Sequence, residues 1–266
     1  MEEKALTAKK SGFSMLLLCF IVFASGAALF VYAIGHLERG ENALGGFLLV
    51  VAILGYIAGI IALPGFKVLK PQEALVLTLF GHYAGTLREP GFYWVCPFCT
   101  AVNPAAGTKL SQSGDVDGGA HAASQSDGMG KKISLKMMTL NNSRQKINDC
   151  LGNPVEIGIA VIWRVTDTAK AVFNVDNYKE YLSLQCDSAL RNVVRVYPYD
   201  VAPNVDTTGD GVADEGSLRG SSEIVAKRIQ DEIQSKVADA GIEIVEARIT
   251  YLAYAPEIAA VMLQRQ

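Results

Sequence analysis

The sequence predicts an α+β protein that begins with two membrane-spanning helices. Two stretches of 24 residues, 11–34 and 43–66, contain no charged side chain, and about 20 apolar residues are enough to cross the hydrocarbon core of a bilayer. Downstream of them, runs of strand-forming residues come first and segments with helical periodicity come later, which is typical of α+β domains. The 266 residues are 50% hydrophobic and only 19% charged, which is too apolar for an ordinary soluble protein.

The charge balance and the composition exclude two classes of protein. The sequence holds 24 Lys and Arg against 27 Asp and Glu, a net charge of -3, so it lacks the positive excess that holds a phosphate backbone. Its apolar content is ample for a core, which excludes a disordered chain. We therefore expect a folded protein with no nucleic-acid partner.

The two uncharged stretches are predicted to form a hairpin. Residues 35–42, which connect them, are polar and too few for a domain, so both outer ends of the hairpin lie on one side of the bilayer. A cleaved signal peptide has an apolar core of only about 7–15 residues and leaves the second stretch unexplained. A re-entrant hairpin is the main alternative to two spanning helices.

Positive charge flanks the hairpin and predicts its orientation. The connection carries one cation, Arg39, whereas five lysines lie outside the two spans. By the positive-inside rule both termini face the cytoplasm, and we expect a multi-pass protein of the plasma (inner) membrane. The five lysines are Lys4, Lys9, Lys10, Lys67 and Lys70.

Glycines within the spans are expected to let the two helices approach closely. Gly55 and Gly59 have the small-xxx-small spacing that is common at such contacts. The other glycines of this kind are Gly26, Gly45 and Gly46.

Short strands follow the hairpin. Residues 73–80 are rich in strand formers, and the aromatic run 92–94 follows two turns. Residues 104–130 have scarcely any large apolar side chain, so they cannot bury enough surface to offset chain entropy. We predict a mobile insertion there.

A β-hairpin and then helices are predicted for the remaining chain. Residues 131–148 and 155–165 read as strands joined by a turn at 149–154, which holds Gly, Asn and Pro. Apolar residues recur at helical spacing from residue 176 and again over 222–240. The last elements are a helix stop at Gly241, a strand over 242–254 and a helix that starts at Pro256.

The pair Cys96 and Cys99 is the sharpest chemical signal. A CxxC pair can lower the thiolate pKa of one cysteine and close a disulfide with the other. Here the pair follows turns, whereas a thioredoxin-like site opens a helix after a strand. Two thiols without redox activity are the competing interpretation, and a disulfide framework is not expected in the cytoplasm. The remaining cysteines are Cys19, Cys150 and Cys186, which lack the paired spacing of a zinc site.

Residues 206–214 resemble a calcium loop in part. Oxygen-bearing residues alternate and Gly211 occupies the sixth position, but the twelfth is Ser217 where a calcium loop has a bidentate Glu. An acidic glycine-rich loop needs no metal, and we predict no metal site.

Catalytic motifs are missing from the sequence. There is no GxSxG, HExxH or GxGxxG, and the three histidines, His36, His82 and His121, fall in separate predicted segments. We therefore predict no catalytic residues, no cofactor and no enzyme activity.

Several motifs in order resemble the SPFH or band 7 family, which includes stomatin, prohibitin and flotillin. The first set is Pro71-Gln72-Glu73, Phe80-Gly81 with Tyr83 and Gly85-Thr86, Pro90-Gly91 with residues 92–94, and Pro97-Phe98. The second set is residues 152–165, 167–171, 189–191 and 243–249. The resemblance covers about residues 67–266.

The resemblance implies a non-enzymatic membrane scaffold. It implies a strand-rich first subdomain on the bilayer, an α/β second subdomain, and many copies in rings or cages that enclose a lipid patch. Some relatives enclose or regulate membrane proteases. The family usually continues from the position of Pro256 into a coiled coil that builds the cage wall, whereas this chain ends at Gln266.

The predicted organisation combines the hairpin with the family domain. It consists of a cytoplasmic N-terminus (1–10), spans 11–34 and 43–66 around a turn (35–42), a first SPFH subdomain (67–165, with the insertion 104–130), a second subdomain (166–255) and the start of a helix (256–266).

Two functional hypotheses follow. The first is a self-assembling membrane scaffold whose partners are lipid, other copies of itself and a membrane client such as a protease. Phe92, Tyr93 and Trp94 would lie at the membrane interface, where aromatic rings settle, although core packing explains them equally well. The alternative is a membrane-anchored thiol oxidoreductase that uses Cys96 and Cys99.

Overall fold

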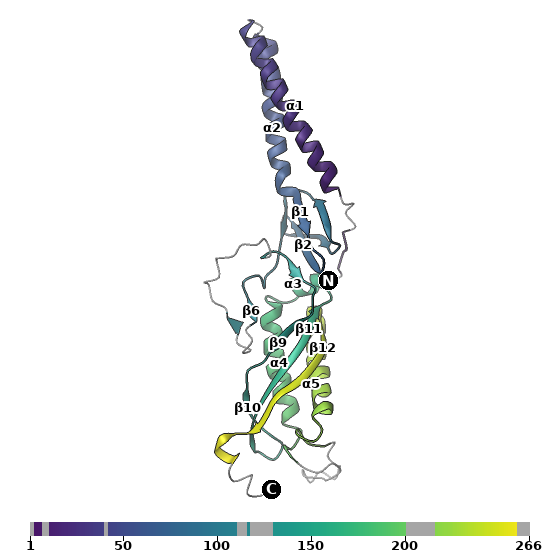
Figure 1. Ribbon diagram of the computed structural model, residues 1–266, viewed down its shortest axis with the longest axis vertical. Helices are drawn as coiled ribbons and strands as arrows, with labels where there is room; N and C mark the ends of the chain where they lie inside the picture. Colours follow the sequence, from purple (N-terminus) through teal and green to yellow (C-terminus); the bar gives the residue numbers. More distant parts are fainter. Residues whose placement is uncertain are drawn as a thin grey trace. The chain divides into compact units, whose positions relative to one another are not determined.

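The computed structural model describes most of the chain and divides it into two compact units. The described residues are 3–6, 11–39, 42–110, 116–117, 130–200 and 216–259. One unit is Lys4–Val102, and the other combines Met1–Glu3 with Asn103–Gln266 (Figure 1). Most of the predicted insertion, the calcium-like loop at 206–214 and the end of the last helix lie outside the described residues.

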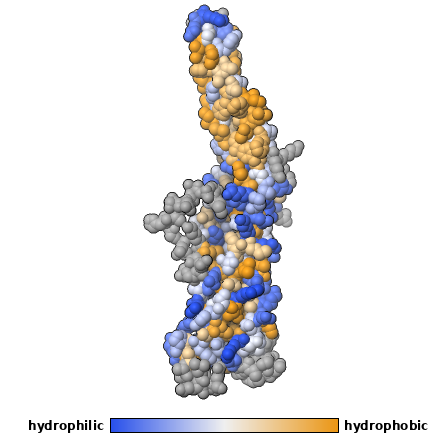
Figure 2. Space-filling model, in the orientation of Figure 1, coloured by the Kyte–Doolittle hydropathy of each residue, from blue (hydrophilic) through white to orange (hydrophobic). Residues whose placement is uncertain are grey.

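Two long helices form the predicted hairpin in the first unit. α1 runs over Gly12–Glu38 and α2 over Asn42–Ala62, followed by a short 3-10 turn at Leu63–Gly65. Both are long and apolar enough to cross a membrane. Their side chains expose apolar surface along almost the whole hairpin (Figure 2), which a helix in water would have to bury. α1 extends four residues past the predicted span, since the polar residues of the connection continue the helix.

Three of the five glycines lie where the helices touch. A Cβ on Gly45 would come within 3.1 Å of the Ala33 carbonyl oxygen, and one on Gly59 within 2.8 Å of the Phe23 ring. Gly26 lies against Tyr56 in the same way. Gly46 and Gly55 have no such neighbour within 4 Å. The predicted close approach therefore depends on Gly26, Gly45 and Gly59 rather than on the Gly55/Gly59 pair.

Substituting valine at Gly45 should separate the helices, whereas valine at the adjacent Gly46 should not. The Gly45 side chain would meet backbone atoms of α1, which cannot rotate away, whereas the Gly46 side chain would point into open space. Disulfide formation between cysteines introduced on facing positions of the helices measures the separation. Equal cross-linking in both variants would contradict the packing described.

Small antiparallel sheets follow the hairpin in the first unit. β1 (Phe66–Leu69) pairs with β4 (Gly91–Trp94), and β2 (Glu73–Leu79) pairs with both β3 (His82–Leu87) and β5 (Cys99–Ala101). Their inward side chains form one apolar cluster. Its buried members are Leu69, Leu75, Leu77, Leu87 and Tyr93.

The segment before α1 adds to this sheet region. The Leu6 amide donates to the Thr86 carbonyl at 2.9 Å, and the Thr86 amide donates to the Lys4 carbonyl at 2.9 Å. Leu6 packs over Gly85, whose φ of +148° and whose missing side chain both suit glycine, because a Cβ there would lie 2.5 Å from Leu6. Residues on either side of the hairpin are thus hydrogen-bonded to each other.

The second unit packs helices on an antiparallel sheet. The sheet order is β10-β11-β12, and β9 also pairs with β11. Helices α4 and α5 pack together, and α5 packs on β12 (Figure 1). The strands are β9 (Met138–Asn141), β10 (Gln145–Asn148), β11 (Pro154–Val165) and β12 (Ile242–Tyr254). The helices are α3 (Thr168–Phe173), α4 (Tyr178–Val194) and α5 (Ser222–Val237), followed by a 3-10 turn at Ala238–Ala240. Shorter strands are β6 (Lys109–Leu110), β7 (Val116–Asp117) and β8 (Ile133–Ser134).

Local signals explain where the helices of the second unit begin and end. The Asp167 side chain accepts from the Lys170 amide at the start of α3, and the Asn177 side chain accepts two amides at the start of α4. Gly241 ends the 3-10 turn that follows α5, with a φ of +65°. A Cβ there would lie 2.3 Å from the Asp167 carbonyl oxygen. The apolar face of α5 is buried, as its four-residue spacing predicted; these residues are Val225, Ile229, Ile233 and Val237.

The main sheet of the second unit contains residues from both sides of position 165. β11, which ends at Val165, pairs along its whole length with β12, and the second unit begins at Asn103. The long-range strand pairing gathers residues from both predicted subdomains into one sheet. Sequence periodicity could not show that pairing.

Alkaline pH should destabilise the second unit through Tyr178. Burial raises the pKa of Tyr178 to about 12, whereas the unfolded chain titrates near 10. The folded state thus keeps this proton longer, so its stabilisation is complete below about pH 10 and is lost as pH rises through about 12. The difference between the pKa values of the folded and the unfolded chain corresponds to about 2–3 kcal/mol. Comparing Tyr178→Phe with the wild type in unfolding at stepped pH isolates this contribution, and parallel pH curves would contradict it.

Candidate membrane interface

The start of α1 packs on β4, at the base of the hairpin. The Phe13 and Phe92 rings meet edge to face, with centroids 5.3 Å apart. Phe92 also stacks on Phe66 of β1 at 5.5 Å. A Cβ on Gly12 would lie 2.7 Å from the Phe92 carbonyl oxygen, so only glycine allows this approach. The aromatic cluster therefore lies at the start of α1.

The end of α2 is hydrogen-bonded to the same strand. The Trp94 indole Nε1 donates to the Ala62 carbonyl at 3.1 Å, and the Val95 amide donates to the Gly65 carbonyl at 2.9 Å. Trp94 thus adds a side-chain hydrogen bond at the point where α2 passes into the 3-10 turn.

Removing the Trp94 hydrogen bond should loosen the hairpin base. We expect Trp94→Phe, which keeps an aromatic ring, to lower the free energy of unfolding by about 1 kcal/mol. We expect Trp94→Ala to cost more because it also removes the ring from its contact with Gly65. Thermal unfolding of the detergent-solubilised chain measures both, and a wild-type midpoint in Trp94→Ala would refute the contact.

Tyr93 belongs to the core and lies apart from the two aromatics beside it. Its side chain is 2% exposed, and its hydroxyl donates to the Glu89 carbonyl at 3.0 Å. Burial, followed by the charge of Glu89, raises the pKa of Tyr93. Successive side chains of a strand point to opposite faces, so Phe92 and Trp94 face the hairpin while Tyr93 faces the apolar cluster. Within the described part of the chain, Phe92 and Trp94 contact the hairpin, and Tyr93 packs in the apolar cluster.

An exposed aromatic pair, Phe80 and Phe98, was not among the residues predicted for the interface. The two side chains are 81% and 57% exposed and stack with centroids 6.2 Å apart. Phe80 has a φ of +48°, which is strained for a bulky residue. Register pairs Leu79 with Cys99, which brings together the turns that carry the two rings. Phe80 before Gly81 was the available signal, because a large aromatic in a turn is unusual.

Cys96 precedes the turn between β4 and β5, and Cys99 is the first residue of β5. The Cys99 amide donates to the Cys96 carbonyl at 2.9 Å, and both thiols are free. Burial, followed by the proximity of Cys96, raises the pKa of Cys99. A raised pKa keeps the Cys99 thiol protonated, whereas a reactive cysteine needs a lowered one. The turn also lacks the helix N-terminus that lowers thiol pKa values in redox pairs.

The other cysteines and histidines of the described part of the chain lie in elements other than those that carry Cys96 and Cys99. Cys19 lies in α1 and Cys186 is buried in α4, where burial raises its pKa. His36 lies in α1 and His82 in β3, while His121 is outside the described residues. Among the described residues, no three His, Cys, Asp or Glu side chains form a group that could hold a metal ion.

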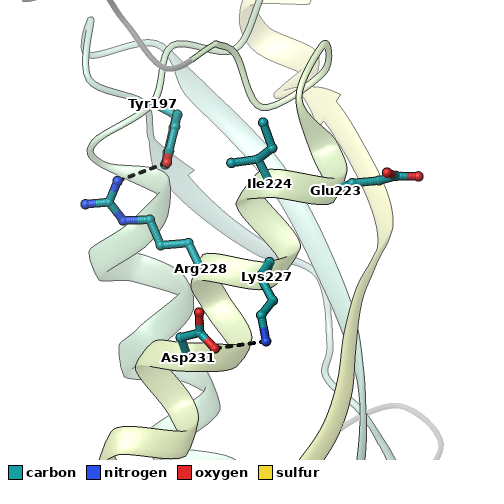
Figure 3. A pocket seen from close by; sticks show the side chains of 6 residues that line it. All are labelled: Tyr197, Glu223, Ile224, Lys227, Arg228 and Asp231. Atoms are coloured by element: carbon teal, nitrogen blue, oxygen red, sulfur yellow. Dashed lines mark hydrogen bonds and ion pairs between the residues drawn. The ribbon is translucent and has the colours of Figure 1, made fainter.

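Two cations line a shallow cavity beside α5, and each contacts a neighbouring side chain. Arg228 donates to the Tyr197 hydroxyl at 3.0 Å, and Lys227 pairs with Asp231 at 3.1 Å (Figure 3). Glu223 and Ile224 complete its lining. Because each cation is directed at a neighbour, this arrangement is that of a solvated helix face.

Comparison with known proteins identifies one family. Residues 67–266 match the family described as SPFH domain / Band 7 family, which covers well over half of the chain. No curated protein matches the chain.

Proposed function

Since the chain belongs to the SPFH domain / Band 7 family, as its sequence motifs indicated, we propose that it is a non-enzymatic, membrane-anchored scaffold. Many copies assemble side by side into rings or cages that organise a membrane microdomain. The hairpin base is the observation that carries the anchoring part: both helices are fixed to β4, through Phe92 at one end and Trp94 at the other. The folded unit therefore cannot move freely away from its anchor.

The interface of this scaffold is formed by the hairpin base and the exposed Phe80/Phe98 pair. Trp94 contacts the last residue of α2, and Val95 contacts Gly65 in the 3-10 turn after it, so the turn of Phe98 lies close to the end of α2. Aromatic rings prefer that depth, and exposure to lipid gives a reason for the strained backbone of Phe80. The bilayer is the partner of this surface.

Quenching of Trp94 fluorescence by brominated lipids tests the interface. The chain has two tryptophans, so a Trp163→Phe background leaves Trp94 as the only indole. We expect strong quenching when bromine lies near the headgroups and weaker quenching when it lies at the bilayer centre. Quenching that is absent at every depth would show that the hairpin base stays in water.

The two termini of the hairpin lie on the same side, in the cytoplasm. Support comes from the hydrogen bonds between residues 4–6 and Thr86, which a bilayer would prevent if it separated them. Lys4, Lys67 and Lys70 favour the cytoplasmic side of a plasma (inner) membrane. A membrane-impermeant maleimide applied to intact cells should label a cysteine introduced at Arg39 but not one introduced at Lys4 or Lys70, in a chain whose exposed native cysteines are serine.

Assembly is tested on the full chain in native membranes. Anchored copies diffuse in two dimensions, which raises their effective concentration, so modest contacts suffice. A lysine-reactive cross-linker should give ladders well beyond a dimer, and particles released by mild detergent should be correspondingly large. Monomers in both measurements would refute the scaffold. Co-purification then identifies the client, for which a membrane protease is our candidate.

Cys96 and Cys99 give the second candidate, a membrane-anchored thiol oxidoreductase. The pair is accessible, with Cys96 exposed, but the raised pKa of Cys99 disfavours it. Replacing both by serine should leave disulfide exchange by purified membranes unchanged. Loss of exchange in that variant, with Cys150→Ser as the matched control, would favour the enzyme over the scaffold.

A further inference from the structure

A closed turn holds the thiols of Cys96 and Cys99 at its two ends. The Cys99 amide donates to the Cys96 carbonyl at 2.9 Å, which is the hydrogen bond that closes a four-residue turn. The Cα atoms at the ends of such a turn lie less than about 7 Å apart, and a disulfide joins Cα atoms about 4.4–6.8 Å apart. The backbone therefore holds these two cysteines at a separation that a disulfide can bridge.

Both ends of this turn are fixed to other elements. The Val95 amide, just before the turn, donates to the Gly65 carbonyl at 2.9 Å. Cys99 lies opposite Leu79 of β2, and its side chain packs against the apolar cluster of the first unit. Because the ends are held in this way, the two sulfur atoms can approach each other without the displacement of either strand.

The two thiols differ in exposure and in acidity. Cys96 is exposed, whereas Cys99 is partly buried. Burial raises the pKa of Cys99, the neighbouring Cys96 thiol raises it further, and the charge of Lys67 opposes both effects. An accessible thiolate is needed to attack a disulfide, so Cys96 is the thiol that an external disulfide meets first.

We propose that Cys96 and Cys99 form a reversible intramolecular disulfide, with a low-molecular-weight disulfide such as oxidised glutathione as the oxidant. The scaffold proposed above gives this pair no role. The pair acts as a redox switch, since each chain is oxidised once and keeps that state until a thiol reduces it.

The oxidation consists of two exchange steps. The Cys96 thiolate attacks one sulfur of glutathione disulfide, whose S–S bond breaks, so that Cys96 carries one glutathione and the other leaves as a thiolate. The Cys99 thiolate then attacks the Cys96 sulfur and displaces the second glutathione. The two protons that the cysteines lose pass through water to the two glutathione thiolates. Two cysteine thiols are thus oxidised by two electrons, and one glutathione disulfide is reduced to two molecules of glutathione.

The partial burial of Cys99 suits a stored disulfide better than rapid turnover. A strongly oxidising disulfide is one whose reduced form is stabilised, commonly through a thiolate of low pKa. The Cys99 thiol has a raised pKa instead, so its thiolate contributes no such stabilisation. We therefore expect slow exchange and a disulfide that persists until reduced glutathione is in excess.

A disulfide at this position would enclose the turn that carries Phe98. The Phe98 ring is exposed and stacks on Phe80 with centroids 6.2 Å apart. A covalent link between the ends of the turn restricts the conformations open to the residues between them. Since Phe98 belongs to the proposed membrane interface, this consequence rests on the proposed function: the redox state would determine how rigidly that ring is presented to the bilayer.

Thiol counting at defined glutathione ratios tests the disulfide. The full chain, in mild detergent, carries Cys150→Ser, which leaves four of its five cysteines. After equilibration and acid quenching, a maleimide mass tag is added under denaturing conditions. We expect four tags with excess reduced glutathione and two tags, without a glutathione adduct, with excess glutathione disulfide; added reductant should restore four. Four tags at every ratio, or a stable adduct in place of the internal disulfide, would overturn the proposal.

Single variants in the same background separate the two steps. Cys99→Ser should accumulate a mixed disulfide between Cys96 and glutathione, because no second thiol displaces the glutathione. Cys96→Ser should react more slowly, because its remaining thiol is partly buried and protonated. Serine has nearly the size of cysteine, so both variants keep the turn. Faster modification of Cys96→Ser than of Cys99→Ser would overturn the assigned order of attack.

Hydrogen exchange measures the effect of the disulfide on the turn. We expect the Cys99 amide, which donates to the Cys96 carbonyl, to exchange more slowly in the oxidised chain than in the reduced chain. The Asn142 amide, which donates to the Ile159 carbonyl at 2.8 Å in the second unit, is the internal control and should not change. Equal exchange of the Cys99 amide in both states would overturn the effect on Phe98.

These measurements fail independently of the proposed function, because they need neither lipid nor assembly. Normal cross-linked ladders together with four tags at every ratio would remove the switch and leave the scaffold. Monomers in native membranes together with a normal thiol titration would remove the scaffold and leave the switch. Consumption of many equivalents of glutathione disulfide per chain would overturn the switch in favour of the thiol oxidoreductase.

Discussion

Replacing Trp163 with alanine should destabilise the second unit by about 3–5 kcal/mol, the range measured for buried aromatic truncations. Trp163 lies near the end of β11, is fully buried and is the largest side chain of the core. Its ring meets that of Tyr178 edge to face, at 6.3 Å, and so joins the sheet to α4. Removing it leaves a cavity between two rigid elements that cannot close.

The matched control is Trp163→Phe. The Trp163 indole Nε1 has no hydrogen-bond partner among the described residues, and an unpaired buried donor is itself costly. Phenylalanine removes that donor while it fills most of the space. We expect a loss of less than about 1.5 kcal/mol. Thermal unfolding followed by circular dichroism measures both variants, and equal losses would show that the ring is not packed as described.

Replacing Asp149 with alanine should cost about 3–5 kcal/mol, because a single buried carboxylate organises the turn between β10 and β11. Its side chain is 4% exposed and accepts from the amides of Leu151 at 2.9 Å and Asn153 at 2.7 Å. It also accepts from the Asn153 side chain at 3.1 Å and from the Tyr199 amide at 3.3 Å. Hydrogen bonds to a charged group contribute about 1.5–3 kcal/mol each, and the donors left behind would be unpaired.

Asp149→Asn should separate the contribution of the turn amides from that of the Tyr199 amide. Its remaining oxygen can still accept the Leu151 and Asn153 amides, which close the turn. Its amide nitrogen cannot accept from Tyr199. We therefore expect a loss of about 1–2 kcal/mol, together with faster hydrogen exchange at the Tyr199 amide. An asparagine variant as unstable as the alanine variant would contradict this division.

The elements with strong local signals were predictable from the sequence. Two uncharged stretches gave the hairpin, alternating apolar residues gave β11, and four-residue spacing gave α5. What joins these elements was not predictable. The pairing of β11 with β12 links residues 77 to 99 positions apart, and no local pattern encodes such a partner.

The contacts of the aromatic residues could be predicted only in part, for the same reason. A run of three aromatics indicates a site near the membrane, but only strand geometry shows that the middle one, Tyr93, turns into the core. Phe80 and Phe98 are 18 positions apart and meet only through the register of β2 and β5. The contacts of Trp94 with Ala62 depend on where α2 ends, which hydropathy gives only to within a few residues.

The hydrogen bonds between residues 4–6 and Thr86 impose an order of events during synthesis. The leading segment leaves the ribosome first, but its partner strand follows only after about 80 further residues, which takes roughly 4–16 s at the usual rate of translation. During that interval both apolar helices are made while Leu6 has no sheet to cover. In the topology that we propose, the nascent chain keeps its first residues on the ribosomal side of the bilayer until β3 is made, so the earliest residues are among the last to reach their native contacts.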